Sequence, residues 1–152
     1  MADENGNSGD PGKDAPETED ARSAPGRRVL ENLAELEPQL VNAGIFDESR
    51  NPLALTSGSG SWPGQARALL DALEEGSAGE EFDSAHIASA GGEVFVVSDS
   101  GLSLVAVTGR YVLASLTSYD MRMALRDVAG ARARTDRVKP SPEAEKDGSD
   151  DA

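Results

Sequence analysis

Between residues 92 and 128, the order of apolar and polar positions predicts three strands followed by a helix. The predicted strands are 93–97, 102–107 and 111–117. They are rich in β-branched and aromatic residues, and the Asp99-Ser100-Gly101 sequence between the first two is typical of a hairpin turn. Each run is nearly continuous in apolar character, so we expect a sheet that is covered on both faces. After Ser118 the apolar residues change to helical spacing, at Met121, Ala124, Leu125 and Val128.

The first half of the chain predicts a helix, a hairpin and a second helix. Apolar residues repeat at helical spacing over 27–37, and Pro38 then disfavours continuation of that helix. The hairpin strands are predicted at 40–46 and 53–56. Ser61 is a suitable N-cap for the second helix. The apolar stripe of that helix consists of Ala66, Leu69, Leu70 and Leu73. Residues 82–89 are compatible with either a strand or a loop.

Both ends of the chain lack the apolar residues that a folded core needs. Residues 1–26 and 135–152 consist mainly of Asp, Glu, Gly, Ser and Pro. Burial cannot offset the entropy of ordering such segments. We therefore expect two disordered acidic tails around one domain at 27–134. Its predicted element order is helix, two strands, helix, three strands and helix, which is an α/β fold of the α+β kind.

The net charge of −14 argues against nucleic acid and against an anionic membrane surface as partners. Phosphate binding needs clustered Lys and Arg, whereas every lysine of this chain lies in an expected tail. We find no signal peptide and no stretch long enough to insert in a membrane, so a cytoplasmic location is expected. Two explanations of the acidic tails stay open: solubility, and recruitment of a basic partner.

The sequence contains no recognisable catalytic centre. His86 is the only histidine and cysteine is absent, which leaves neither a multi-histidine metal site nor thiol chemistry. Neither a Gly-x-Ser-x-Gly elbow nor a phosphate-binding loop is present. The acidic pairs Glu74-Glu75 and Glu80-Glu81 flank a predicted helix end, where solvated charge is expected. We therefore expect no enzyme activity and no cofactor.

Two features allow both a structural and a functional interpretation. Trp62, the only tryptophan, either seals an edge of the core or anchors a partner at the start of the second helix. Arg122 and Arg126 lie four positions apart on the last helix. They either form ion pairs with carboxylates at the sheet edge, which is the favoured interpretation, or recognise a partner.

The predicted order of elements resembles that of the roadblock/LC7 family, whose fold is related to the longin and profilin folds. Residues 92–107 and 111–116 are similar to the three-strand block of that family, and residues 121–126 are similar to its closing helix. Residues 43–47 resemble its first strand, and the similarity covers about 28–131. The turn at 48–51 departs from the family pattern, which usually has Gly after an acidic residue.

The resemblance implies a non-enzymatic, homodimeric domain with a five-stranded antiparallel sheet. Such proteins act as regulators or scaffolds for Ras-like small GTPases. In the family, the second helix and the third strand of each subunit meet at the dimer interface. On this chain the implied dimer contacts are Ala66, Leu69, Leu70, Leu73, Phe82 and Val94. The implied contacts with a GTPase are Trp62 and Arg67.

Two other functions are alternatives. A ligand-sensing domain of the profilin, PAS or GAF kind needs a pocket, which we expect between Phe95, Val97, Leu104 and Tyr111. An enzyme would depend on His86, the only histidine.

Overall fold

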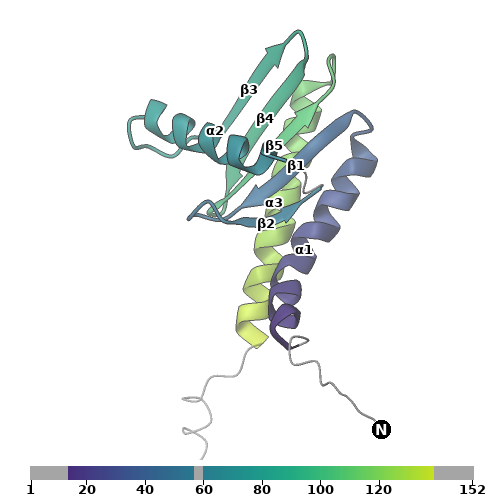
Figure 1. The fold of residues 1–152 in the computed structure, drawn as a ribbon, viewed down its shortest axis with the longest axis vertical. Coiled ribbons are helices and arrows are strands. Elements are labelled where there is room, and N and C mark those ends of the chain that lie inside the picture. The colour runs from purple at the N-terminus through teal and green to yellow at the C-terminus, as the bar shows by residue number, and fades with distance from the viewer. Residues whose placement is uncertain (1–13, 57–59, 139–152) are drawn as a thin grey trace, which may run out of the picture.

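The computed structural model describes residues 14–56 and 60–138, and side chains over 23–56 and 60–137. The helices are α1 (Asp14–Leu36), α2 (Trp62–Gly76) and α3 (Ala114–Val138). The strands are β1 (Leu40–Phe46), β2 (Pro52–Leu55), β3 (Ser84–Ser89), β4 (Gly92–Asp99) and β5 (Leu102–Thr108). This order, α-β-β-α-β-β-β-α, confirms the predicted fold class (Figure 1).

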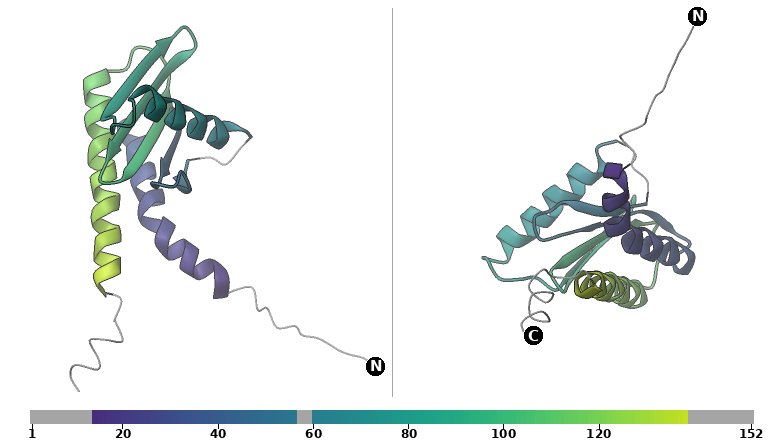
Figure 2. Two further views of the ribbon diagram at one scale, coloured as in Figure 1. Left: turned by 90° about the vertical axis from the view of Figure 1, so that its left-hand side faces the viewer. Right: turned by 90° about the horizontal axis from the view of Figure 1, so that it is seen from below.

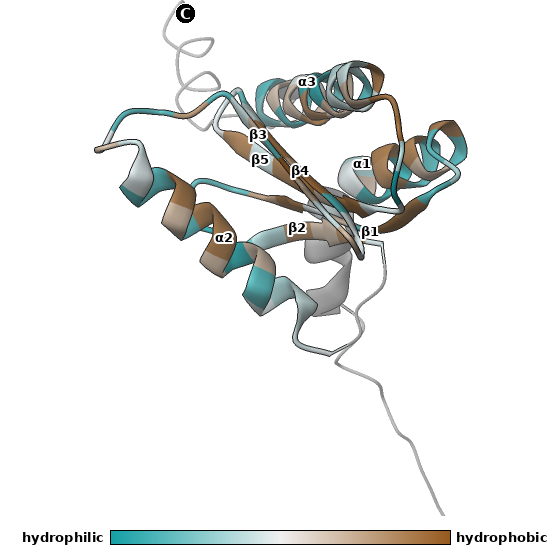
Figure 3. Cartoon of the chain, turned by 90° about the horizontal axis from the view of Figure 1, so that it is seen from above, coloured by the Kyte–Doolittle hydropathy of each residue, from teal (hydrophilic) through white to brown (hydrophobic). Residues whose placement is uncertain are grey.

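The five strands form one antiparallel sheet in the order β2-β1-β5-β4-β3. The β4–β5 hairpin turns at Ser100 and Gly101, which both have positive φ angles of 57° and 78°. Such a two-residue turn matches the twist of the flanking strands. Helices α1 and α3 cover one face of the sheet and α2 lies over the other, as seen from above in Figure 3. The prediction of a sheet covered on both faces is therefore confirmed.

Each face of the sheet has its own apolar core. The larger core lies under α1 and α3, where Phe95, Leu104, Met121 and Leu125 are fully buried. The smaller core lies under α2, where Ala66 and Leu70 pack with three buried sheet residues. These three are Phe46, Val96 and Val105. Because alternate residues of β4 point to opposite faces, this strand contributes to both cores.

The predicted strand at 111–117 is wrong. Residues 111–113 form the connection after β5, and α3 already begins at Ala114. Thr117 is buried four positions before Met121, so the helical stripe starts earlier than predicted. The third strand of the meander is instead β3, in the segment that was compatible with a strand or a loop. That strand is mostly exposed and so carries little apolar signal.

The first and last helices extend beyond their predicted limits. Helix α1 begins at Asp14, inside the expected tail, and α3 continues to Val138. Gly26 is buried where α1 crosses β2, and a Cβ atom there would approach that of Ala54 to 2.9 Å. Packing of α1 on the sheet therefore starts before the predicted boundary. Both helices project past the sheet in the side view of Figure 2. Residues 1–13, 57–59 and 139–152, which include half of the expected N-terminal tail and most of the C-terminal one, lie outside the described residues.

The start of β4 depends on a glycine. Gly92 has a φ of 150°, and a Cβ atom there would lie 2.6 Å from the carbonyl oxygen of Thr108 on β5. We expect Gly92→Ala to lower the free energy of unfolding by about 2 kcal/mol, because it combines backbone strain with a backbone clash. Urea unfolding followed by circular dichroism measures this loss.

Gly91→Ala is the matched control, since no atom of the described residues lies within 4 Å of a Cβ atom at that position. We expect its unfolding free energy to stay within about 0.5 kcal/mol of the wild type. Equal losses in the two variants would contradict the proposed role of Gly92.

Candidate protein-protein interface

Strand β3 is an open edge of the sheet. Within the described part of the chain it pairs only with β4, and the carbonyl of Asp83 accepts a hydrogen bond from the amide of Ser98 at 3.0 Å. Asp83 and Ser98 therefore form a hydrogen-bonded pair. Hydrogen-bonded and non-hydrogen-bonded pairs alternate along an antiparallel ladder, so the residues after Asp83 point their backbone groups alternately away from β4 and toward it. The backbone groups of Ser84, His86 and Ala88 point away from it. These donors and acceptors are available to another strand.

The opposite edge of the sheet is protected. Strand β2 has only 4 residues and begins with Pro52, which has no amide hydrogen to donate. A register shift between Ile45 and Phe46 also interrupts its pairing with β1. Strand β3 has 6 residues without proline, lysine or a carboxylate. Short strands, proline and irregular pairing are common means of blocking edge pairing, and β3 shows none of them.

Helix α2 presents apolar side chains beside this open edge. Leu70 and Ala66 are buried in the smaller core, whereas Leu69 and Leu73 are only half-buried. Phe82 and Val94, on the segment before β3 and on β4, are also half-buried against the same core. We define the β3–α2 surface by the residues Leu69, Leu73, Phe82, Ala85, Ile87 and Val94. Figure 1 shows α2 extending past the sheet on the side of β3.

The two residues expected to contact a GTPase lie in different environments. Trp62 is half-buried, and a Cβ atom on Gly44 of β1 would lie 3.0 Å from its ring. This placement agrees with the interpretation in which the ring seals an edge of the core. Arg67 is exposed on α2 and forms no ion pair among the described residues.

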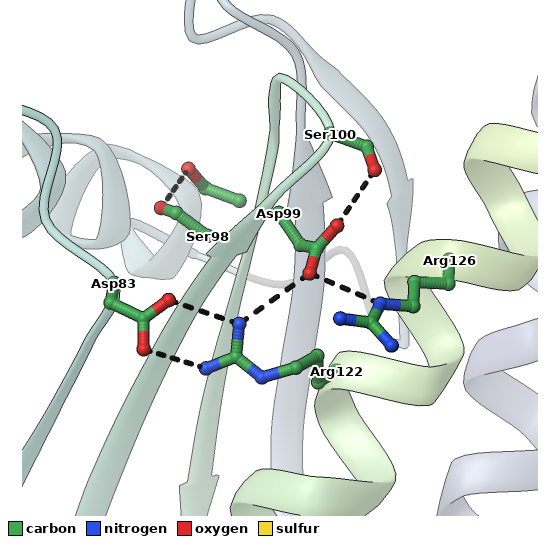
Figure 4. Close-up of polar contacts among 7 residues, drawn as sticks. Asp83, Ser98, Asp99, Ser100, Arg122 and Arg126 are labelled. Atoms are coloured by element: carbon green, nitrogen blue, oxygen red, sulfur yellow. Dashed lines mark hydrogen bonds and ion pairs between the residues drawn. The ribbon is translucent and has the colours of Figure 1, made fainter.

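An ion-pair network connects α3 to the segment that precedes β3 (Figure 4). Arg122 contacts both carboxylate oxygens of Asp83 at 3.1 Å, and it lies 3.4 Å from Asp99. Arg126 contacts the same oxygen of Asp99 at 3.2 Å. The hydroxyl of Ser100 and then these two arginines lower the pKa of Asp99. The favoured interpretation of both arginines, ion pairing with carboxylates at the sheet edge, is therefore confirmed.

His86 and Glu93 form a second polar contact, between β3 and β4. The Nε2 atom of His86 lies 2.8 Å from Glu93, and its ring stacks on Phe95 with 4.3 Å between centroids. The backbone amide of Tyr111 donates to the other oxygen of Glu93 at 2.7 Å. Glu93 thus links the edge strand to the connection before α3. Among the described residues, Glu93 is the hydrogen-bonding partner of the imidazole ring.

The environment of Glu93 predicts a loss of stability in acid. The hydrogen bond from His86 and then the amide of Tyr111 hold the pKa of Glu93 below its ordinary value of 4.5. The folded protein then binds fewer protons at this site than the unfolded chain, so the stabilisation is complete above that value. The stabilisation from Glu93 is lost as the pH falls from 4.5 through the lowered pKa of this carboxylate. We expect Glu93→Gln to flatten this part of the pH profile of the unfolding free energy.

Urea unfolding at a series of pH values between neutral and acid measures the profile. Glu35→Gln is the matched control, because Glu35 is exposed on α1 and forms no ion pair among the described residues. An unchanged acid slope in Glu93→Gln would contradict the role assigned to this carboxylate.

The pocket that a ligand-sensing domain needs is not at the expected place. Phe95, Val97 and Leu104 are fully buried against one another in the larger core, whereas the side chain of Tyr111 is exposed. A depression of about 330 Å³ lies elsewhere, between the β4–β5 turn and the end of α2. Carboxylates line much of it, and Arg50 there already pairs with Asp71 and Glu74.

The described part of the chain contains neither a metal-binding cluster nor a membrane-spanning helix. Within residues 14–56 and 60–138, no group of three or more His, Asp or Glu side chains is placed to hold a metal ion. No helix in these ranges has the length and apolar character needed to cross a bilayer.

Several solved structures share this fold at low sequence identity. A roadblock/LC7 domain from Streptomyces avermitilis matches with a TM-score of 0.55 at 18% identity, over 69% of this chain and 92% of that chain. Myxococcus xanthus MglB matches with a TM-score of 0.56 at 10% identity, over 82% and 94%. The gliding protein MglB from Thermus thermophilus matches with a TM-score of 0.55 at 14% identity, over 74% and 90%. The chain therefore has the roadblock/LC7 fold, as predicted.

No family model and no curated protein matches the amino-acid sequence. The likeness thus lies in the arrangement of helices and strands. Any role of the β3–α2 surface therefore rests on the geometry of its own residues.

Proposed function

We propose that this protein is a non-enzymatic, homodimeric regulator or scaffold of the roadblock type, which acts on a Ras-like small GTPase in the cytoplasm. One observation carries the proposal: the unprotected edge strand β3 lies beside half-buried leucines of α2, on a domain with the roadblock/LC7 fold.

The chemistry of this edge supports the proposed dimer. Pairing of β3 with β3 of a second copy satisfies the outward backbone groups of Ser84, His86 and Ala88. The same contact covers Leu69 and Leu73 of both subunits, and the burial of their apolar surface adds stability. Ala66 and Leu70, which were expected to contribute directly, are already buried within the subunit and support α2 from beneath.

The GTPase is the partner that the roadblock/LC7 resemblance implies. A two-fold axis beside β3 brings the two α2 helices together, so that Arg67 and the edge of Trp62 are presented twice on one surface. The sequence has no phosphate-binding loop of its own. Contact with a nucleotide-binding protein therefore explains such a surface better than binding of a free nucleotide does.

Two measurements test the proposal. Light scattering at tens of micromolar should give the mass of two chains, and a strict monomer would overturn the dimer. Calorimetry with a purified Ras-like GTPase, loaded with GDP or a non-hydrolysable GTP analogue, tests the partner. We expect binding to one nucleotide state and a loss of about tenfold in affinity with Arg67→Ala.

Arg28→Ala is the matched control for the GTPase experiment, because Arg28 is an exposed arginine of α1 on the other side of the sheet. Arg67→Ala is more informative than Trp62→Ala, since removal of a half-buried ring also disturbs packing. Equal effects of the two arginine variants would exclude α2 as the docking helix.

A further inference from the structure

A second apolar surface lies on the helical face of the molecule, away from β3 and α2. Four large apolar side chains there are exposed to solvent, and they come from the end of α1 and the first half of α3. Their exposed fractions are 61% for Leu36, 49% for Leu116, 60% for Tyr119 and 38% for Met123. Exposed apolar residues that gather in one place usually mark an interaction site.

Two of these side chains, Leu36 and Met123, line a depression between the helices, and the other two continue from Met123 along α3. Leu116, Tyr119 and Met123 follow the i, i+3, i+7 spacing, so they form a stripe on α3. Between α1 and α3 lies a depression of about 90 Å³. Its lining residues include Leu33, Leu36, Met123 and Ala124. We call this depression and the adjoining α3 stripe the α1–α3 groove. Small-molecule sites usually exceed about 300 Å³, so the depression fits one aliphatic side chain better than it fits a small ligand.

The wall of the groove carries negative charge. Asp120 and Asp127 of α3 line it, and neither forms an ion pair among the described residues. The polar side chain on the α1 wall is that of Asn32. An apolar floor beside unpaired carboxylates fits an apolar partner surface that is flanked by Lys or Arg.

The segments of this chain outside the structure do not fit the groove. Residues 1–13 and 139–152 contain no Leu, Ile, Val, Phe, Tyr or Trp, and both are acidic. A second copy fits poorly as well. A two-fold contact through this surface would bring Asp120 and Asp127 close to their own counterparts, and like charges in an interface are costly.

We propose that the α1–α3 groove binds an amphipathic helix of another protein, whose apolar face is flanked by Lys and Arg. One aliphatic side chain of that helix enters the depression between Leu36 and Met123, and its neighbours cover Leu116 and Tyr119. The basic flanks face Asp120 and Asp127. Such a helix-in-groove contact leaves the β3–α2 surface free, so one subunit can hold two partners at once.

A model peptide tests the groove. The probe is a helical peptide of Leu and Lys, about 18 residues long, with Leu along one face. The reference peptide has Ala in place of every Leu and the same charge. We expect the Leu/Lys peptide to shift the amide NMR signals of Leu36, Leu116 and Met123, and to bind about tenfold more tightly than the Ala/Lys peptide. Equal affinity of the two peptides, or shifts confined to α2 and β3, would overturn the proposal.

Variants of the protein separate the contributions of the apolar and the acidic side chains to peptide binding. Leu116→Ser with Met123→Ser should weaken binding of the Leu/Lys peptide about tenfold, and Asp120→Asn with Asp127→Asn should weaken it about threefold at low salt. Ile87→Ser removes a comparably exposed side chain on β3 and should leave peptide binding unchanged. Unchanged melting temperatures show that the variants fold. If the Leu116/Met123 double variant changes the mass of the protein in solution, a second copy occupies the groove and the proposal is wrong.

Discussion

Replacing Ala88 with proline is expected to convert the proposed dimer into a monomer. Ala88 lies on the open edge strand, and its amide points away from β4, so the change removes a donor that only another subunit can use. Proline at this position leaves the ladder between β3 and β4 bonded, because edge strands tolerate proline where the amide faces outward. Light scattering at several concentrations should show the mass of one chain for this variant and that of two chains for the wild type.

Ala88→Val is the matched control, since valine keeps the outward amide and has a higher strand propensity. We expect it to remain dimeric. Ser84→Pro provides a second test at the other end of β3, where proline begins the strand. If both proline variants stay dimeric and fold with unchanged circular dichroism, the two copies do not meet through β3, and the proposed dimer is wrong.

The largest loss of stability is expected from Phe95→Ala. Phe95 is fully buried in the larger core and stacks against the ring of His86 on the edge strand. Truncation removes its transfer free energy and leaves a cavity between the sheet and α3, which together cost about 3–5 kcal/mol. Urea unfolding at one fixed protein concentration measures the loss, because the stability of the proposed dimer depends on concentration.

Leu113→Ala is the control for this truncation. Leu113 has 72% of its surface exposed, although it is as apolar as the core residues. We expect its unfolding free energy to stay within about 0.5 kcal/mol of the wild type. Comparable losses from Phe95→Ala and Leu113→Ala would mean that the two cores are not arranged as described.

The sequence by itself determined the three helices, the strands β1, β2, β4 and β5, the β4–β5 turn and the double-sided cover of the sheet. These features are encoded locally. Valine-rich runs favour strands, the Ser100-Gly101 pair favours positive φ angles, and continuous apolar character requires cover on both faces. The sequence also predicted that Arg122 and Arg126 pair with carboxylates at the sheet edge, but only the structure identified Asp83 and Asp99 as these carboxylates.

Only the tertiary structure decided which segment is the edge strand. Residues 111–117 carry more apolar character than β3 does, yet part of them forms the first turn of α3. The mostly exposed segment 84–89 forms a strand because β4 supplies its backbone partners. Such pairing leaves no pattern in the sequence of the strand itself. The strand order then leaves β3 unpaired on one side and half-exposes Leu69 and Leu73. Both candidate interfaces therefore depend on contacts between segments far apart in the chain, which no local pattern of residues specifies.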